Sequence, residues 1–538
     1  MKRFLLLFIS FVLLFSAWEQ KPGVSGKVSA LEDGSTLTGV NVDLKGTAND
    51  TAARILKGTD RPNILFVFDD QHRKDAVSCY GSINIQTPSI DRLAHEGIRF
   101  TNALSTTPLC TPYRAMLMTG KYPTHTGFLL NFVNPRPGER GIADVFNEAD
   151  YQTGFIGKWH LTSGFITHHS MLEPEEGPVS STLIEPEFVP PGRGRLGFQY
   201  WAAFNFHMSY HQGFYYRDTP EPQYYPDYEA EWMANDAIKF LEQHTDTDSP
   251  FFLMVAFHYP HPLWRGELDV PTEALKEIPK NIKLPPNSKQ KLPFEVVSFG
   301  DTRSLLSLEQ VRTYYAMCVE VDKNFGRILE YLDRSGLANN TIVVFTTDHG
   351  EQLGSHGRKS KMLPFEESIN IPLVIRWPGH IKAGAVSDAL YTPMDHISTL
   401  CALVGIDPPD DIDGIDLSGE VLKTGKVQRD DVLIAHYVST PNYCQAKHAE
   451  LQWRGVRSKT HTYAKNIDGG ELLFDNIADP YQMTNLIGNE ENRPLQELMR
   501  RRLKQLLAEA NDDLLPGTYY SDWFDDTRTV VRTGRGRP

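Results

Sequence analysis

Short, uninterrupted apolar runs alternate along the chain with longer segments whose apolar residues recur at helical spacing. Continuous runs of about four to eight apolar residues are typical of strands that are buried on both faces. The runs occupy residues 63–68, 153–156, 251–257, 342–347 and 372–376, and the segments with helical spacing are 88–97, 228–243, 308–335 and 393–404. Buried strands that alternate with helices predict an α/β sandwich.

The pattern changes after about residue 428. Residues 453–464 and 471–475 resemble antiparallel strands, and residues 493–510 form a charged amphipathic helix pattern. The four arginines of residues 528–538 favour a disordered end. The predicted segments are a main domain (61–428), a smaller α+β subdomain with an antiparallel sheet (429–520) and a tail (521–538).

The N-terminal segment has the pattern of a secretory signal peptide. Met1, Lys2 and Arg3 precede an apolar run over residues 4–15, which is too short for a comfortable transmembrane helix. Residues 1–20 are therefore predicted to direct the protein out of the cell or into a periplasm, with an uncleaved anchor as the alternative. Residues 21–60 are interpreted as a β-rich remnant or linker, and no later run is long enough to span a bilayer.

Composition excludes several classes of partner and site. The 538-residue chain has 68 acidic and 54 basic side chains and a net charge of −14, which argues against nucleic acid. Apart from Cys110, its four other cysteines are widely spaced and include no C-x-x-C pair. The sequence therefore predicts neither a disulfide framework nor a zinc site.

Acidic residues follow two of the predicted strands directly. Asp69 and Asp70 end the first apolar run, and Asp348 and His349 follow residues 342–347. Functional side chains of α/β folds commonly lie at the carboxyl ends of strands. Two adjacent carboxylates repel each other unless a cation binds between them, although an isolated Asp-Asp pair is more often a solvated turn.

Cys110 begins the run Cys-Thr-Pro-Tyr-Arg, and Thr119, Gly120 and Lys121 follow a short apolar segment. This stretch resembles the signature of the type I sulfatases, C-x-P-x-R followed by T-G-[RK]. In isolation, Cys110 would be interpreted as a buried free cysteine. The resemblance gains weight because the other blocks of that family's active site occur in the same order over residues 61–486.

The resemblance implies that Cys110 is oxidised to formylglycine by a maturation enzyme, a formylglycine-generating or a radical enzyme, which recognises the proline and Arg114. The hydrated aldehyde carries two hydroxyl groups. One attacks the sulfur of a sulfate ester, and loss of a proton from the other lets the sulfated intermediate collapse. Such covalent catalysis divides one difficult step into two easier ones.

The resemblance also assigns the surrounding residues. It implies a metal site of Asp69, Asp70, Asp348, His349 and the oxidised Cys110, and this oxygen-rich set suits Ca²⁺, with Mg²⁺ or Mn²⁺ as alternatives. Asp348 and His349 are followed by Gly350, as in the family's second metal block.

Three further blocks supply basic residues. Gly157 to Leu161 matches a G-K-W-H block, in which Lys158 binds a sulfate oxygen and His160 orients or deprotonates the formylglycine hydroxyl. His261 matches the residue that protonates the leaving alcohol, and Lys361 matches a lysine that contacts sulfate. Without this context, Lys158 would be interpreted as a surface lysine and His160 as a hydrogen-bonded loop histidine.

Residues 198–232 are rich in aromatic side chains and include His207 and His211. Aromatic faces can bind sugar rings, and a packed loop core is the equally weighted alternative.

The combined pattern predicts an alkaline-phosphatase-like α/β sandwich, with a large central mixed sheet flanked by helices and a C-terminal α+β subdomain. The expected activity is hydrolysis of a sulfate ester, on a sulfated carbohydrate. The alternatives are a formylglycine-dependent phosphonate monoester or phosphodiester hydrolase, and a non-catalytic carbohydrate-binding pseudo-sulfatase. No membrane contact is expected beyond the signal peptide.

Overall fold

The computed structural model describes residues 61–164, 188–245, 247, 249–288, 306–438 and 452–537, together with four two-residue strands outside these ranges. The chain divides into two units, Met1–Thr47 and Ala48–Pro538. In the first, β1 (Val28–Ser29) and β2 (Thr36–Leu37) pair antiparallel. The predicted signal peptide, the rest of residues 21–60 and Cys444 lie outside the described residues. Within the described part, no helix is both long and apolar enough to cross a bilayer.

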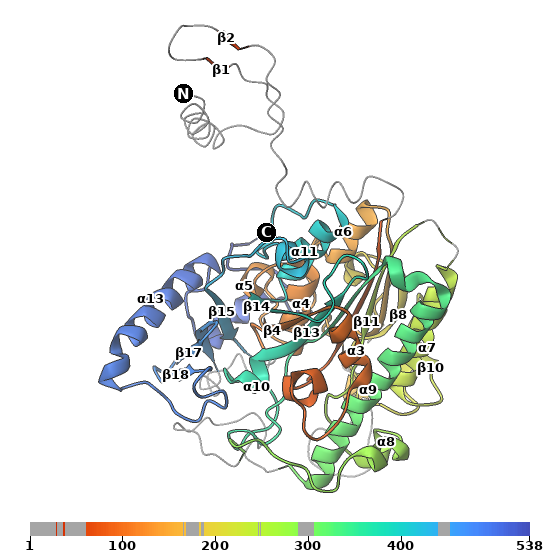
Figure 1. Ribbon diagram of the computed structural model, residues 1–538, viewed down its shortest axis with the longest axis horizontal. Coiled ribbons are helices and arrows are strands. Elements are labelled where there is room, and N and C mark those ends of the chain that lie inside the picture. Colours follow the sequence, from red (N-terminus) through yellow and green to blue (C-terminus); the bar gives the residue numbers. More distant parts are fainter. Residues whose placement is uncertain are drawn as a thin grey trace. The chain divides into compact units, whose positions relative to one another are not determined.

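The second unit is built around an eight-stranded mixed sheet (Figure 1). Its order is β14 (Ala385–Tyr391), β4 (Ile98–Leu104), β13 (Asn370–Arg376), β12 (Thr341–Thr347), β3 (Asn63–Asp69), β11 (Phe251–Ala256), β5 (Gln152–Lys158) and β8 (Tyr200–Phe204). Strands β12, β3, β11, β5 and β8 are parallel, whereas β13 runs antiparallel to both β12 and β4. The prediction of a large mixed sheet is confirmed.

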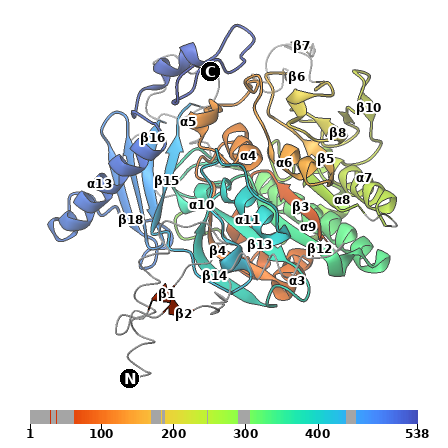
Figure 2. The ribbon, with the colours of Figure 1, turned by 90° about the horizontal axis from the view of Figure 1, so that it is seen from above.

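Helices cover both faces of this sheet because successive strand side chains point to opposite sides. Phe66 and its alternate neighbours pack into one core with α4 (Cys110–Thr119), α6 (Ile142–Glu148) and α11 (Asp395–Val404). Leu65 and Val67 pack into the other core with α3 (Pro88–Glu96), α7 (Glu229–Gln243) and α9 (Leu308–Ser335). Figure 2 shows the long helix α9 lying close to α3 and the central strands.

A separate four-stranded antiparallel sheet follows the main sheet in the chain. Its order is β15 (Asp431–His436), β16 (Trp453–Ser458), β17 (His461–Asn466) and β18 (Glu471–Asp475). Val456 and Tyr463 on one face pack against Leu503 of α13 (Arg493–Glu509). The prediction of a small antiparallel sheet with a charged amphipathic helix is confirmed.

Several short elements complete the unit. They are α5 (Pro123–Thr126), α8 (Thr272–Glu277), α10 (Glu366–Ile369), α12 (Ser418–Val421), and the paired strands β6 (Ile166–Thr167) with β7 (Thr182–Leu183) and β9 (Phe214–Tyr215) with β10 (Gln223–Tyr224).

The prediction that the tail is disordered is wrong for residues 528–537. Val530 is fully buried and its N–H donates to the carbonyl of Asn134, whose own N–H donates to Arg528. Arg535 forms an ion pair with Asp413 at 3.0 Å. The arginine content suggested a solvated end, but one buried valine and paired backbone groups are enough to fix the segment against the main unit.

Candidate active site

The blocks predicted to carry chemistry meet at one edge of the large sheet. Strands β12, β3, β11 and β5 are parallel neighbours, and their registers place Thr347 beside Asp69 and Ala256 beside Gly157. Their carboxyl ends therefore lie side by side. At Gly157, φ is +104° and a Cβ atom would lie 2.3 Å from the carbonyl oxygen of Ala256, so only glycine permits this strand end to turn toward the site.

Cys110 is the first residue of α4 and is buried. Its Sγ lies 3.2 Å from Nε2 of His349 and 3.9 Å from Oδ1 of Asp70. Together with Asp348, these groups place four possible ligand atoms within 4.8 Å of one another. A nucleophile at this position lies beside the positive end of the α4 dipole, which favours an anionic substrate group.

Asp69 occupies a different position from the other predicted metal ligands. Its Oδ2 pairs with Nδ1 of His72 at 2.6 Å, whereas Oδ1 is buried and has no hydrogen-bond partner among the described residues. A buried carboxylate oxygen without a partner is costly. The orphaned oxygen and the two neighbouring carboxylates fit a hard divalent cation, which would satisfy all three.

Arg114 links two of the candidate ligands. Its guanidinium lies 3.0 Å from Oδ2 of Asp70 and 3.1 Å from Oδ2 of Asp348, and all three side chains are fully buried. Nη1 also donates to the carbonyl of Lys158 at 2.5 Å. Burial opposes the charge, but Asp348 and Asp70 outweigh it and raise the pKa of Arg114. The residue predicted from the signature thus also fixes the orientation of two carboxylates.

The two carboxylates that Arg114 joins differ in their affinity for protons. Nζ of Lys158 lies 2.6 Å from Oδ2 of Asp70, and despite burial this ammonium, together with the Arg114 guanidinium, lowers the pKa of Asp70. Burial and the charge of Asp70 raise the pKa of Asp348 to about 7. A proton in the metal-free site therefore belongs on Asp348.

The two predicted acid–base histidines are neutral in this environment. Burial, followed by Lys158 and Arg114, lowers the pKa of His160 well below its usual value. Its ring stacks on Phe206 at 4.7 Å, and neither nitrogen has a hydrogen-bond partner among the described residues. Burial, Lys158 and Lys361 likewise lower the pKa of His261. Nδ1 of His261 can donate to the carbonyl of Pro262 at 2.7 Å, which leaves Nε2 for chemistry.

Lys361 reaches the same site through residues that the sequence analysis did not single out. Nζ of Lys361 donates to Oε1 of Gln71 at 2.5 Å, and Nε2 of Gln71 donates to Glu351. His72 orients Asp69 through the contact between its Nδ1 and Oδ2 of that carboxylate. Gln71, His72 and Glu351 each lie one or two residues after a predicted metal ligand, and that proximity in the sequence was the available signal.

The aromatic stretch contains a second cluster, His207, Glu229 and His258, which is buried. Nε2 of His207 donates to the carbonyl of Phe214 at 3.0 Å, and Nδ1 accepts the N–H of Ser209 at 3.2 Å. Both nitrogens of His207 are therefore engaged, which fits a residue of the packed core. His258 differs, because neither of its ring nitrogens has a hydrogen-bond partner among the described residues. His211, the other candidate, is exposed and stacks on Tyr228 at 4.5 Å.

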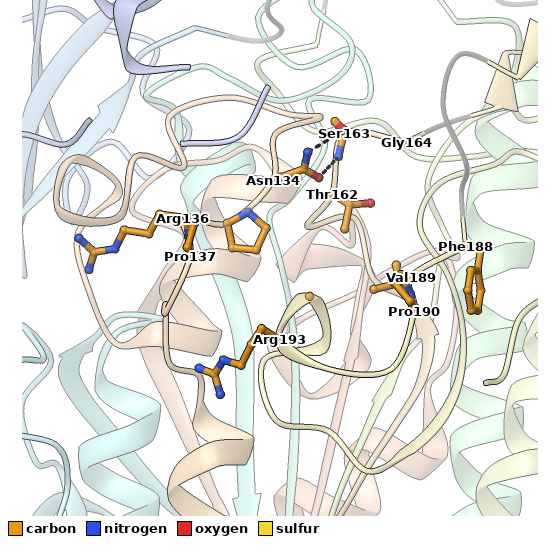
Figure 3. A pocket seen from close by; sticks show the side chains of 12 residues that line it. Asn134, Arg136, Pro137, Thr162, Ser163, Gly164, Phe188, Val189, Pro190 and Arg193 are labelled. Carbon is orange, nitrogen blue, oxygen red and sulfur yellow. Dashed lines mark hydrogen bonds between the residues drawn. The ribbon is translucent and has the colours of Figure 1, made fainter. Parts of the chain in front are cut away.

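A pocket of about 380 Å³ adjoins the loop that follows His160. Figure 3 shows Asn134 facing Ser163, with which it exchanges two hydrogen bonds of 2.9 Å, and Phe188 on the opposite side. The arginines in its wall are paired, Arg136 with Glu139 and Arg193 with Asp144. The lining residues are Asn134, Pro135, Arg136, Pro137, Thr162, Ser163, Gly164, Phe188, Val189, Pro190, Arg193 and Gly194.

The mixed sheet and the strand-end site are those of an alkaline-phosphatase-like α/β fold, and comparison with known proteins specifies the family. The sulfatase family profile matches residues 62–406, and the profile of the C-terminal region of N-sulphoglucosamine sulphohydrolase matches residues 354–509. The chain belongs to the sulfatase family and is a sulfuric ester hydrolase.

Individual relatives cover most of the chain. An ulvan-active sulfatase of Formosa agariphila is 34% identical, over 86% of this chain and 84% of its own length. An N-acetylglucosamine-6-O-sulfatase of Bacteroides thetaiotaomicron is 31% identical, over 89% and 90%. A protein solved in complex with its substrate D-glucosamine-2-N,6-O-disulfate is 26% identical and superimposes with a TM-score of 0.70, covering 84% of this chain and 99% of the other.

Proposed function

We propose that the protein hydrolyses a sulfate ester of a carbohydrate, with an oxidised Cys110 as nucleophile and one divalent cation beside it. The observation that carries this proposal is the position of Sγ of Cys110, 3.2 Å from His349 and 3.9 Å from Asp70 at the meeting point of four parallel strand ends. The names of the relatives support a saccharide substrate, because they are active on ulvan or on N-acetylglucosamine sulfate.

The cation would be bound by Asp69, Asp70, Asp348 and His349, and when bound it would supply positive charge for a sulfate oxygen. Ca²⁺ is the expected ion, with Mg²⁺ or Mn²⁺ as alternatives, because most of the donors are carboxylate oxygens. A formylglycine at position 110 would supply a hydroxyl nucleophile.

The chain's own residues have separate tasks around that centre. Lys158 and Lys361 place ammonium groups where a sulfate anion can accept hydrogen bonds. His160 is neutral, so it can take a proton from the nucleophilic hydroxyl at position 110. His261 donates a proton to the departing alcohol oxygen. An anionic ester bound beside His261 favours its charged form and offsets the pKa lowering caused by burial and the two lysines.

The pocket beside Ser163 is proposed to receive the part of the saccharide beyond the sulfated ring. Three prolines, Val189 and Phe188 offer apolar surface to sugar C–H groups, while Asn134 and Ser163 present polar atoms. Pockets of a few hundred Å³ with this mixture are typical of small-ligand sites.

A desulfation screen tests the proposed function. Matured protein is incubated with defined mono- and oligosaccharides that are sulfated at single positions, and released sulfate is measured by ion chromatography. Nitrophenyl sulfate, a phosphodiester and a phosphonate monoester serve as comparison substrates. Release of sulfate from at least one saccharide is expected, at a higher kcat/KM than any phosphorus ester shows. Preference for the phosphonate would favour the alternative hydrolase, and inactivity on every ester would favour the pseudo-sulfatase.

A further inference from the structure

Lys361 is surrounded by unusual backbone conformations. The residues on either side of it, Ser360 and Met362, have φ angles of +73° and +76°, and Gln71, which accepts its hydrogen bond, has φ of +73°. Residues other than glycine rarely adopt the left-handed region with positive φ, and such strain persists only where the surrounding structure imposes it. Three such residues around one ammonium group indicate that its position is tightly determined.

Gln71 contacts several parts of the site at once, and it is fully buried. Its N–H donates to Oδ1 of Asp348 at 3.1 Å, and its carbonyl accepts the hydroxyl of Tyr314 at 3.1 Å. Its side-chain oxygen accepts from Lys361, and its side-chain nitrogen donates to Oε2 of Glu351. The residue therefore joins a candidate metal ligand, the sulfate-site lysine and a buried carboxylate.

The direction of the Gln71 amide is fixed by its two partners. An ammonium group only donates hydrogen bonds and a carboxylate only accepts them. The amide oxygen must therefore face Lys361 and the NH₂ group must face Glu351. The other oxygen of Glu351 accepts the N–H groups of Leu353, at 3.0 Å, and of Ser360, next to Lys361. Glu351 thus constrains Lys361 both through Gln71 and through the backbone.

We propose that Gln71 is a positioning residue for the reaction: with Glu351 it orients the Lys361 ammonium toward the sulfate group. The inference rests on the proposed function, because it assigns Lys361 to the sulfate. Gln71 touches no reacting atom in this arrangement and acts through Lys361. Removing the acceptor or reversing the amide leaves the ammonium free to turn away from the bound ester.

The chain permits an exchange test of this orientation. Gln71→Glu alone places two carboxylates against each other. Glu351→Gln alone places two NH₂ groups against each other. The Gln71 amide can relieve this second clash only by turning its NH₂ group toward Lys361, which then loses its acceptor. In the double variant Gln71→Glu with Glu351→Gln, the new amide can donate to the new carboxylate. Its oxygen can still accept from Leu353 and Ser360, and Lys361 keeps an acceptor. The net charge of the pair is unchanged.

The expected result is a loss of about tenfold or more in kcat/KM for each single variant, within the coupling range of residues in one hydrogen-bond network. The double variant should recover most of that loss. The inhibition constant of inorganic sulfate should rise in the single variants and return to the wild-type value in the double variant. The bound metal content of all three variants should stay at the wild-type value.

Gln352→Glu is the matched control, because Gln352 is a buried neighbour that donates to Ser368 at 2.7 Å and not to Lys361. Its effect should not be relieved by Glu351→Gln.

Single variants as active as the wild type would overturn the proposal, and so would a double variant no better than the poorer single one. If Gln71→Glu loses metal as well as activity, the residue acts through Asp348 and the proposal is also wrong. A wild-type protein that releases no sulfate from any ester contradicts the proposed function itself, which distinguishes the two failures.

Discussion

Nζ of Lys158 lies 2.6 Å from Oδ2 of Asp70, with both side chains fully buried. In the metal-free site this ammonium supplies part of the positive charge that the carboxylate needs. Once a cation is bound to Asp70, Lys158 can turn its charge to the substrate. We expect Lys158→Met to lower kcat for a sulfate ester about 10²–10³-fold, as the loss of one preorganised donor to a developing anion does.

Lys74→Met serves as the comparison for that loss. Lys74 is a half-buried lysine that donates to the carbonyl of Thr101 and to Asn370 and does not contact Asp70. Its replacement should leave kcat close to the wild-type value. Steady-state kinetics on one sulfate ester decides the matter, and equal losses in both variants would contradict a direct role for Lys158.

Arg114→Leu is expected to destabilise the metal-free protein by about 3–5 kcal/mol, because it leaves two buried carboxylates without their shared guanidinium. Added Ca²⁺ should restore part of the lost stability by replacing the missing charge. Thermal unfolding with and without Ca²⁺ measures both effects. Arg376→Leu, which breaks a buried arginine's pair with Glu96, should also destabilise but should gain nothing beyond the wild-type response to Ca²⁺. A Ca²⁺ response of the same size in both variants would refute the interpretation.

Metal removal should abolish activity reversibly, with Ca²⁺ restoring most of it and Mg²⁺ less. The affinity should also depend on pH. Burial and Asp70 raise the pKa of Asp348 to about 7, so below pH 7 a proton must leave Asp348 before the cation binds. Lowering the pH from 8 to 6 should therefore weaken Ca²⁺ binding, by up to about tenfold per pH unit below 7. Calorimetric titration measures the Ca²⁺ affinity at each pH. An affinity that does not change over this range would contradict the release of a proton from Asp348 when the cation binds.

Strands that are buried on both faces could be predicted, because each of them gives a continuous apolar run in the sequence. Strands β3, β5, β11, β12 and β13 were found in this way. The strands β4 and β14 were missed because polar residues interrupt them. β4 reads IRFTNAL and contains half-buried positions, and β14 reads AVSDALY, with buried and exposed residues alternating over its first half.

The site residues that could be predicted are those that directly follow a strand or belong to the C-x-P-x-R signature. Asp69, Asp70, Cys110, Asp348 and His349 were expected to converge, and the ligand atoms of all of them except Asp69 lie within 4.8 Å of one another. Gln71 and Glu351 were not predicted, because their contribution depends on the direction of an amide between two partners 290 and 280 residues away along the chain. Sequence spacing carries no information about such an orientation.

His261→Ala should damage desulfation of a sugar much more than hydrolysis of nitrophenyl sulfate. A sugar hydroxyl is a poor leaving group that needs a proton, whereas a nitrophenolate leaves unaided, and general acid catalysis contributes about 10²–10⁴-fold. The measurement is kcat on the two substrates in parallel. Equal losses on both would move His261 from proton donor to sulfate binding, with Lys361 as the next candidate for the acid.

The identity of residue 110 in the active protein tests the central claim most directly. Trypsin releases it in the peptide that spans residues 100–114, and mass spectrometry distinguishes a cysteine there from the lighter aldehyde. We expect the aldehyde in protein that releases sulfate, and we expect Cys110→Ala to fold normally without turnover. Active protein that carries only unmodified cysteine at position 110 would contradict the proposed mechanism.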